Sequence, residues 1–386
     1  MEPLVDEKGN KHYLTEELAQ DGQGRLYRTK NAGFIIRHAH NKDHTALYES
    51  AKLMPLEGIE NLVLPEYYLE QPQVGYILQI PDGFLPLSSI MHTNGDKKTF
   101  YHESGGIRRR LAILTELTKT LIKLNSLPCM YGGMTQSRIF ISPKNTPISV
   151  KLLYSVKMTY AMPLVPEIDE DSYIAPESKE GLANSQSDIF ALGALAIDVL
   201  TLGKSIDILS PEIKDILDLT QQKDGAKRPK LIEIYRTLMR YLDLLTTCKK
   251  CGTDFIYTSK SCTHCNAPPP KMLKAQIYDK GAGVSIDRGI KILEFATIRQ
   301  YFWNFHTDHL LLTDEVQPRI ECLLNISADK KLRLVFKNLY DDKELIINNK
   351  TVPPGQPIAI PMPCDVVRIS LKLYSEIERF IDVVMI

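Results

Sequence analysis

The chain has 386 residues, and its 47 basic side chains are balanced by 47 acidic ones. This length suffices for two or three domains, and the neutral balance gives no indication of binding to nucleic acid or to an anionic membrane. No apolar run reaches the roughly 18 to 20 residues of a spanning helix, and the acidic N-terminal stretch does not resemble a signal peptide. Four of the seven cysteines form one cluster, which favours a reducing cytoplasm over a disulfide framework.

The first predicted feature is a strand, a glycine turn and a second strand over residues 18–28. Gly22 and Gly24 lie in the turn. Two glycines at this spacing allow a backbone to fold closely over a phosphate, but an ordinary hairpin turn explains them equally well.

A third strand is predicted at 33–37 and ends at Arg37. The helical spacing of apolar residues in 45–54 predicts a short helix that carries Glu49, and Pro55 ends it. Another apolar strand follows at 74–80. Arg37 and Glu49 can pair with each other across a functional cleft. Alternatively, Arg37 is an ordinary charge at the end of a strand and Glu49 is a solvated side chain.

The centre of the chain combines a long helix with a loop and two strands. Apolar residues recur every three or four positions from 107 to 127, which predicts an amphipathic helix. The loop that follows reads Met-Tyr-Gly-Gly-Met-Thr-Gln-Ser-Arg over 130–138 and includes Gly133 and Arg138. Strands are expected on both sides of a turn at 143–145, and the second runs up to Tyr154.

Three further motifs follow in a fixed order. Ala-Pro-Glu ends at Glu177, Asp-x-x-x-x-Gly begins at Asp188, and Arg-Pro begins at Arg228. This ordered set resembles the large lobe of protein kinases, and the likeness extends over about residues 12–245. It is closest to bacterial kinases encoded beside a von Willebrand A-like protein and a metal-dependent Ser/Thr phosphatase in tellurite-resistance-associated gene triads.

The resemblance implies a kinase-like frame without its chemical groups. Gly133 stands at the position of the catalytic-base Asp, Arg138 at that of the Mg-binding Asn, and Tyr154 at that of the D-F-G Asp. It also implies that Glu177 pairs with Arg228. Asp188 would hold the loop backbone.

This reading predicts an inactive pseudokinase that serves as a protein-binding scaffold or regulator in a bacterial phospho-signalling or stress system, with no role for ATP. The von Willebrand A-like protein and the phosphatase are the expected partners. The alternative is a nucleotide-sensing or residually active protein in which Gly22 and Gly24 fold over phosphates that Arg37 and Arg138 bind in place of Mg²⁺.

Two C-x-x-C pairs follow the kinase-like region, separated by ten residues. This spacing predicts a zinc ribbon with a structural ion held by Cys248, Cys251, Cys262 and Cys265. His264 lies inside the second pair and is expected to be a neighbour of the ion. The nearby lysines are too few for a nucleic-acid footprint.

After a proline-rich linker at 267–270 the pattern changes to short alternating runs. These predict strands near 310–313, 319–324, 331–336, 344–347, 357–360, 366–371 and 380–385. The expected fold class is therefore α+β, with a bilobal kinase-like domain (1–245), a zinc ribbon (246–270) and a β-sandwich-like domain (271–386).

Overall fold

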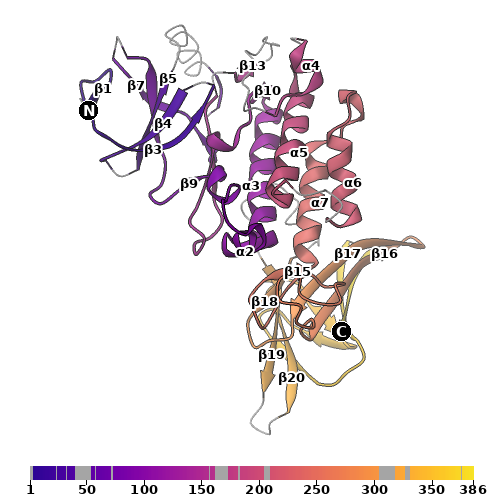
Figure 1. Ribbon diagram of the computed structural model, residues 1–386. Coiled ribbons are helices and arrows are strands. Elements are labelled where there is room, and N and C mark those ends of the chain that lie inside the picture. Colours follow the sequence, from indigo (N-terminus) through magenta and orange to yellow (C-terminus); the bar gives the residue numbers. More distant parts are fainter. Residues whose placement is uncertain are drawn as a thin grey trace. The chain divides into compact units, whose positions relative to one another are not determined.

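The computed structural model describes residues 3–22, 24–31, 33–39, 54–56, 58–70, 73–155, 157–160, 173–180, 183–203, 209–303, 318–326, 331–374 and 376–386 (Figure 1). The chain divides into two compact units, unit 1 (Met1–Leu238) and unit 2 (Met239–Ile386). Helices and strands are mixed, so the predicted α+β class is confirmed. Within the described residues, no helix has both the length and the apolar character needed to cross a membrane.

Unit 1 contains a five-stranded antiparallel sheet, and the strands predicted at 18–28, 33–37 and 74–80 belong to it. Its order is β3 (Leu14–Asp21), β4 (Gly24–Thr29), β5 (Phe34–Ala39), β8 (Gly75–Gln79) and β7 (Pro65–Tyr68). A short ribbon of β1 (Leu4–Val5) and β2 (Lys11–His12) precedes it. The predicted helix at 45–54 and Glu49 lie in the undescribed part of the chain, apart from residue 54.

The helices of unit 1 follow the apolar spacing of the sequence. They are α2 (Lys97–Glu103), α3 (Gly106–Ser126), α4 (Pro176–Lys179), α5 (Ser185–Thr201), α6 (Pro211–Thr220) and most of α7 (Leu231–Asp243), whose residues 239–243 belong to unit 2. The predicted helix at 107–127 is confirmed as α3, whose leucines 111, 114, 117, 121 and 124 are all buried. In Figure 1 α5 runs beside α3 and α6, against which it packs.

Short strands hold the loop that follows α3. A four-stranded sheet joins β6 (Leu62–Val63), β12 (Val150–Leu153), β11 (Ile139–Ile141) and β9 (Leu85–Pro86). β10 (Cys129–Met130) pairs with β13 (Thr159–Tyr160), and the 3₁₀ turn η3 (Gln136–Arg138) leads into β11. These strands fix both ends of the glycine-containing loop.

Unit 2 opens with the antiparallel pair β14 (Leu245–Thr247) and β15 (Asp254–Ile256). A six-stranded sheet follows, in the order β17 (Val284–Glu294), β16 (Met272–Gly281), β25 (Ile377–Met385), β24 (Val367–Tyr374), β21 (Leu345–Ile347) and β22 (Lys350–Val352). A four-stranded sheet joins β18 (Gln300–Trp303), β19 (Pro318–Ile326), β20 (Leu332–Asn338) and β23 (Pro357–Pro361). One core takes Ala275 and Ile381 from the larger sheet and Phe336 from the smaller one.

The strands of unit 2 agree with most of the sequence pattern. Residues 348 and 349, both asparagine, have positive φ angles of 46° and 65° in the turn between β21 and β22. The predicted strand at 310–313 lies in the undescribed part of the chain. The long hairpin of β16 and β17 was not predicted. The two-unit division also places the cysteine segment in the same unit as the two sheets.

Candidate functional site

The first candidate site is a group of four side chains in unit 1, which we call the arginine cluster. Its members are Asp21 at the end of β3, Arg37 in β5, and Ser137 and Arg138 in η3. Asp21 Oδ1 accepts a hydrogen bond from Arg37 Nη1 at 2.5 Å. Asp21 Oδ2 accepts from Arg138 Nε at 3.1 Å and from the Ser137 hydroxyl at 2.9 Å. One carboxylate thus joins two guanidinium groups that are 101 positions apart in the sequence.

The arginine cluster is closed to solvent. The side chains of Asp21, Arg37 and Arg138 are each 0 % exposed. Burial alone would raise the pKa of Asp21, but the charges of the two arginines outweigh it and hold this pKa well below its usual range. Asp21 is therefore ionised, and the cluster is an internal ion-pair network.

The three positions of the predicted empty catalytic site lie close to this network. Arg138 Nη1 donates to the backbone oxygen of Gly133 at 2.5 Å. The backbone oxygen of Tyr154 accepts from the hydroxyl of Tyr76 at 3.2 Å, and both tyrosine side chains are fully buried. Arg138 Nη1 also lies 3.5 Å from the hydroxyl oxygen of Ser155, which directly follows Tyr154. The structure therefore brings Gly133, Arg138 and Tyr154 into one region.

The two glycines of the β3–β4 turn were candidates for a phosphate-binding loop. Gly24 has a φ of +141°, and a Cβ atom built on it would lie 2.1 Å from the backbone oxygen of His38 in β5. Gly24 is therefore needed for close approach of two strands. Gly22 lies next to Asp21, so the turn leads directly into the arginine cluster.

Asp188 supports the loop from the first turn of α5. Its two carboxylate oxygens accept hydrogen bonds from the backbone N–H groups of Tyr131 and Gly132, at 2.7 and 3.0 Å. The predicted role of Asp188 in holding the loop backbone is confirmed. Burial raises its pKa to about 6, although the two N–H groups act in the opposite direction.

Glu177 and Arg228 form the predicted pair. Arg228 donates to both carboxylate oxygens, at 2.5 and 2.9 Å. The hydroxyl of Ser187 adds a third hydrogen bond to Glu177, at 2.8 Å. The bidentate geometry fixes the segment around α4 against the end of the 3₁₀ turn η5 (Gly225–Lys227), which precedes α7.

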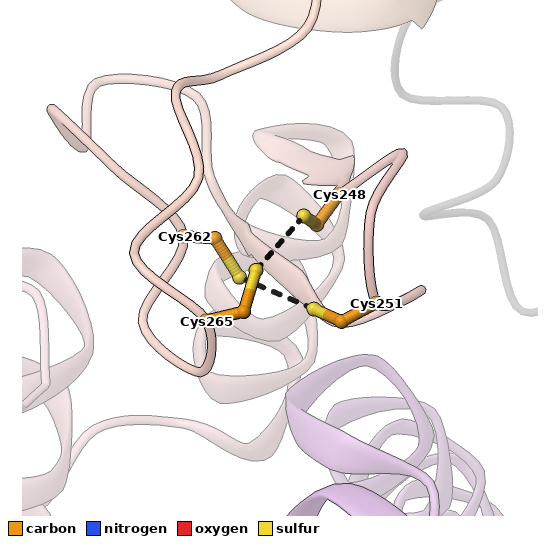
Figure 2. Close-up of side chains that lie close together, drawn as sticks. All are labelled: Cys248, Cys251, Cys262 and Cys265. Atoms are coloured by element: carbon orange, nitrogen blue, oxygen red, sulfur yellow. Dashed lines mark hydrogen bonds between the residues drawn. The ribbon is translucent and has the colours of Figure 1, made fainter.

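The second candidate site is the group of four cysteines in unit 2 (Figure 2). Its sulfur atoms lie within 4.8 Å of one another and can hold a metal ion; the ligands are Cys248, Cys251, Cys262 and Cys265. The Cys248–Cys265 and Cys251–Cys262 sulfur pairs are each 3.6 Å apart. These distances are far above the roughly 2.05 Å of a disulfide bond.

The two C-x-x-C turns have the same backbone hydrogen bonds. Gly252 N donates to the oxygen of Cys248 at 2.9 Å, and Asn266 N donates to the oxygen of Cys262 at 3.0 Å. Gly252 and Asn266 both have positive φ angles, 73° and 57°, as their place after each pair predicts. His264 is not among the grouped ligands, but its backbone N–H lies 3.4 Å from the Cys262 sulfur.

Sequence reasoning missed Asp21 and Ser137. Asp21 directly precedes the glycine turn, where an Asp is an ordinary turn residue. Ser137 precedes Arg138 but belongs to no motif.

No protein-family model matches the chain, and a search of curated proteins finds no match.

Proposed function

We propose that the chain is a bacterial pseudokinase, in which a kinase-like frame serves as a binding scaffold without phosphoryl transfer. The observation that carries the proposal is the fully buried ion pair of Arg138 with Asp21. Arg138 stands where the resemblance places a ligand of Mg²⁺, and a guanidinium cannot coordinate a cation. Kinase chemistry depends on Mg²⁺ to neutralise phosphate charge.

Two other positions support the same conclusion. Gly133 has no side chain that can accept a proton from a substrate hydroxyl, and Tyr154 carries no carboxylate for a metal. The contacts of Asp188 and of Glu177 with Arg228, in contrast, are present. The side chains that would stabilise a kinase-like fold are therefore present, whereas the side chains that would carry out phosphoryl transfer are replaced by other residue types.

Phosphate incorporation tests the loss of catalysis. The purified chain, with Mg²⁺ or Mn²⁺ and labelled ATP, should transfer no phosphate to itself or to a general protein substrate above the level without enzyme. An active kinase in the same buffer is the positive control. Incorporation by wild-type protein that disappears in Arg37→Ala, with folding unchanged, would contradict the proposal.

The expected partners are a von Willebrand A-like protein and a metal-dependent Ser/Thr phosphatase, in the cytoplasm of a bacterium. Each should be purified and titrated against the chain by calorimetry. We expect at least one to bind with a dissociation constant in the micromolar range or tighter, without added nucleotide. Failure of both, with the chain folded and loaded with metal, would remove the support for this choice of partners.

We propose that the four-cysteine site holds one structural zinc ion, as in a zinc ribbon. A tetrahedral ion with Zn–S bonds of about 2.3 Å places sulfur atoms about 3.8 Å apart, close to the 3.6 Å pairs observed. Four thiolates complete the coordination, so no position remains for a substrate. Elemental analysis should find one zinc per chain in wild-type protein. A Cys262→Ser variant that retains the full amount would contradict this ligand set.

A further inference from the structure

The donor groups of the arginine cluster form an arrangement that binds oxyanions. Two guanidinium groups and one hydroxyl donate to the two oxygens of a single carboxylate. Guanidinium groups recognise carboxylate and phosphate through the same N–H···O contacts. An anion with oxygens at these positions would find the same donors if Asp21 were absent.

The charges in the cluster also favour an anion. Arg37 and Arg138 contribute two positive charges and Asp21 one negative charge, so these three groups sum to +1. Removal of the Asp21 carboxylate would leave two buried positive charges close together. Removing one partner of a buried ion pair is costly, and a bound anion would take the place of the lost partner.

Asp21 lies on a different segment from the donors. It is the last residue of β3 and pairs with Gly24, the first residue of β4. Ser137 and Arg138 belong to η3, more than 110 positions away, and Arg37 lies inside β5. Substitution of Asp21 alone can therefore remove the carboxylate and leave η3, which carries Ser137 and Arg138, unchanged, while β5, which carries Arg37, stays paired with β8.

We propose that Asp21 is the built-in occupant of an oxyanion site made by Arg37, Arg138 and Ser137, and that its carboxylate closes this site to external anions. The site takes phosphate-type or small carboxylate anions once the carboxylate of Asp21 is removed. The proposal rests on the arginine cluster alone and does not depend on partner binding.

Chemical rescue tests the proposal. Asp21→Ala deletes the carboxylate and vacates the volume that its oxygens occupied. Melting temperatures of unit 1 should be followed by circular dichroism at 222 nm, in chloride and in acetate, phosphate, pyrophosphate or ATP at equal ionic strength and without Mg²⁺. We expect Asp21→Ala to melt several degrees below wild type in chloride and to recover at least half of the loss, saturably, in one of the other anions.

Matched variants separate this effect from general stabilisation by phosphate. Glu17→Gln removes an exposed carboxylate from the same strand, β3, and should respond to the anions as wild type does. Asp21→Ala combined with Arg138→Gln should lose the rescue. The anion that rescues best identifies the source: acetate indicates a site of carboxylate size, whereas pyrophosphate or ATP indicates room for a nucleotide.

Three outcomes would overturn the proposal. One is an Asp21→Ala variant that responds to every anion as wild type does, since the network would then have only a packing role. Another is a wild-type shift as large as that of the variant, because Asp21 would then not close the site. If the variant fails to fold in chloride, refolding should succeed in phosphate or acetate, and failure in every anion also refutes the proposal. None of these results changes the test of partner binding.

Discussion

Replacement of Arg228 by alanine should destabilise unit 1 strongly. The five N–H donors of its guanidinium group are all used: two by Glu177 and three by the backbone oxygens of Gln186, Gln222 and Lys223. The side chain of Arg228 is 0 % exposed and that of Glu177 is 17 % exposed. Arg228→Ala therefore leaves a largely buried carboxylate without its cation.

The expected cost is about 3 to 5 kcal/mol, the usual range for removing one partner of a buried pair. We expect a cost near 3 kcal/mol, because water can reach part of the Glu177 carboxylate. For a unit of this size, such a loss lowers the melting temperature by about 6 to 20 °C. Arg228→Lys should cost about 1 to 3 kcal/mol, because an ammonium group has three donors for five acceptors.

Urea denaturation followed at 222 nm measures this cost in unit 1, since nearly all the described helical residues lie there. Arg25→Ala is the matched control. Arg25 forms an exposed ion pair with Glu17, and its loss should cost less than about 1 kcal/mol. The double variant Glu177→Ala with Arg228→Ala should cost less than the sum of the single variants by about 0.5 to 3 kcal/mol. A cost below 1 kcal/mol for Arg228→Ala, or strict additivity, would refute the reasoning.

Three further predictions concern packing, pH and metal. Gly193→Ala should cost about 1 to 3 kcal/mol in urea denaturation, because the new Cβ would lie 1.7 Å from the hydroxyl oxygen of Thr220, and a neutral result would contradict the tight packing of α5 on α6. The free energy of unfolding of wild type should exceed that of Asp21→Asn by a constant amount from pH 8 to 5, and this difference should shrink below about pH 4. The pKa of Asp21 is lower in the folded state than in the unfolded state, where it is about 3.9. The stabilisation by Asp21 is therefore complete above the unfolded-state pKa and is lost on acidification. A stability difference between the two proteins that grows on acidification would contradict this prediction. Chelation of zinc should leave the ellipticity at 222 nm nearly constant, because nearly all the described helical residues lie in unit 1 and the four cysteines lie in unit 2. A large loss of this signal would show that unit 1 also depends on the metal.

The sequence predicted best those features that depend on neighbouring residues. The four-cysteine site is local, because each C-x-x-C turn needs only its own residues and a left-handed position after it, which Gly252 and Asn266 supply. The helix α3 is visible in its apolar spacing. The hairpin of β16 and β17 also has a local signal, since the apolar residues Leu273, Ala275 and Ile277 alternate with polar ones and residues 281–283 form a small-residue turn.

Contacts between distant residues were predicted only where a resemblance supplied them. Glu177 and Arg228 are 51 positions apart, and the ordered motifs identified them as partners. Nothing comparable connected Asp21 with Ser137 and Arg138, which are 116 and 117 positions away. Spacing and periodicity describe one element at a time, so they cannot show which side chain fills the place of a missing ligand.

The position of β25 in the larger sheet has a consequence for biosynthesis. β25 pairs with β16 along its whole length, from Gly281 opposite Ile377 to Leu273 opposite Met385. At bacterial or eukaryotic elongation rates of about 5 to 20 residues per second, the ribosome reaches Ile377 roughly 5 to 20 s after Gly281. Throughout that interval β16 has an unpaired edge that can join a strand of another nascent chain. Translation speed over this stretch therefore affects the yield of native protein, and slow codons between the two strands should increase aggregation.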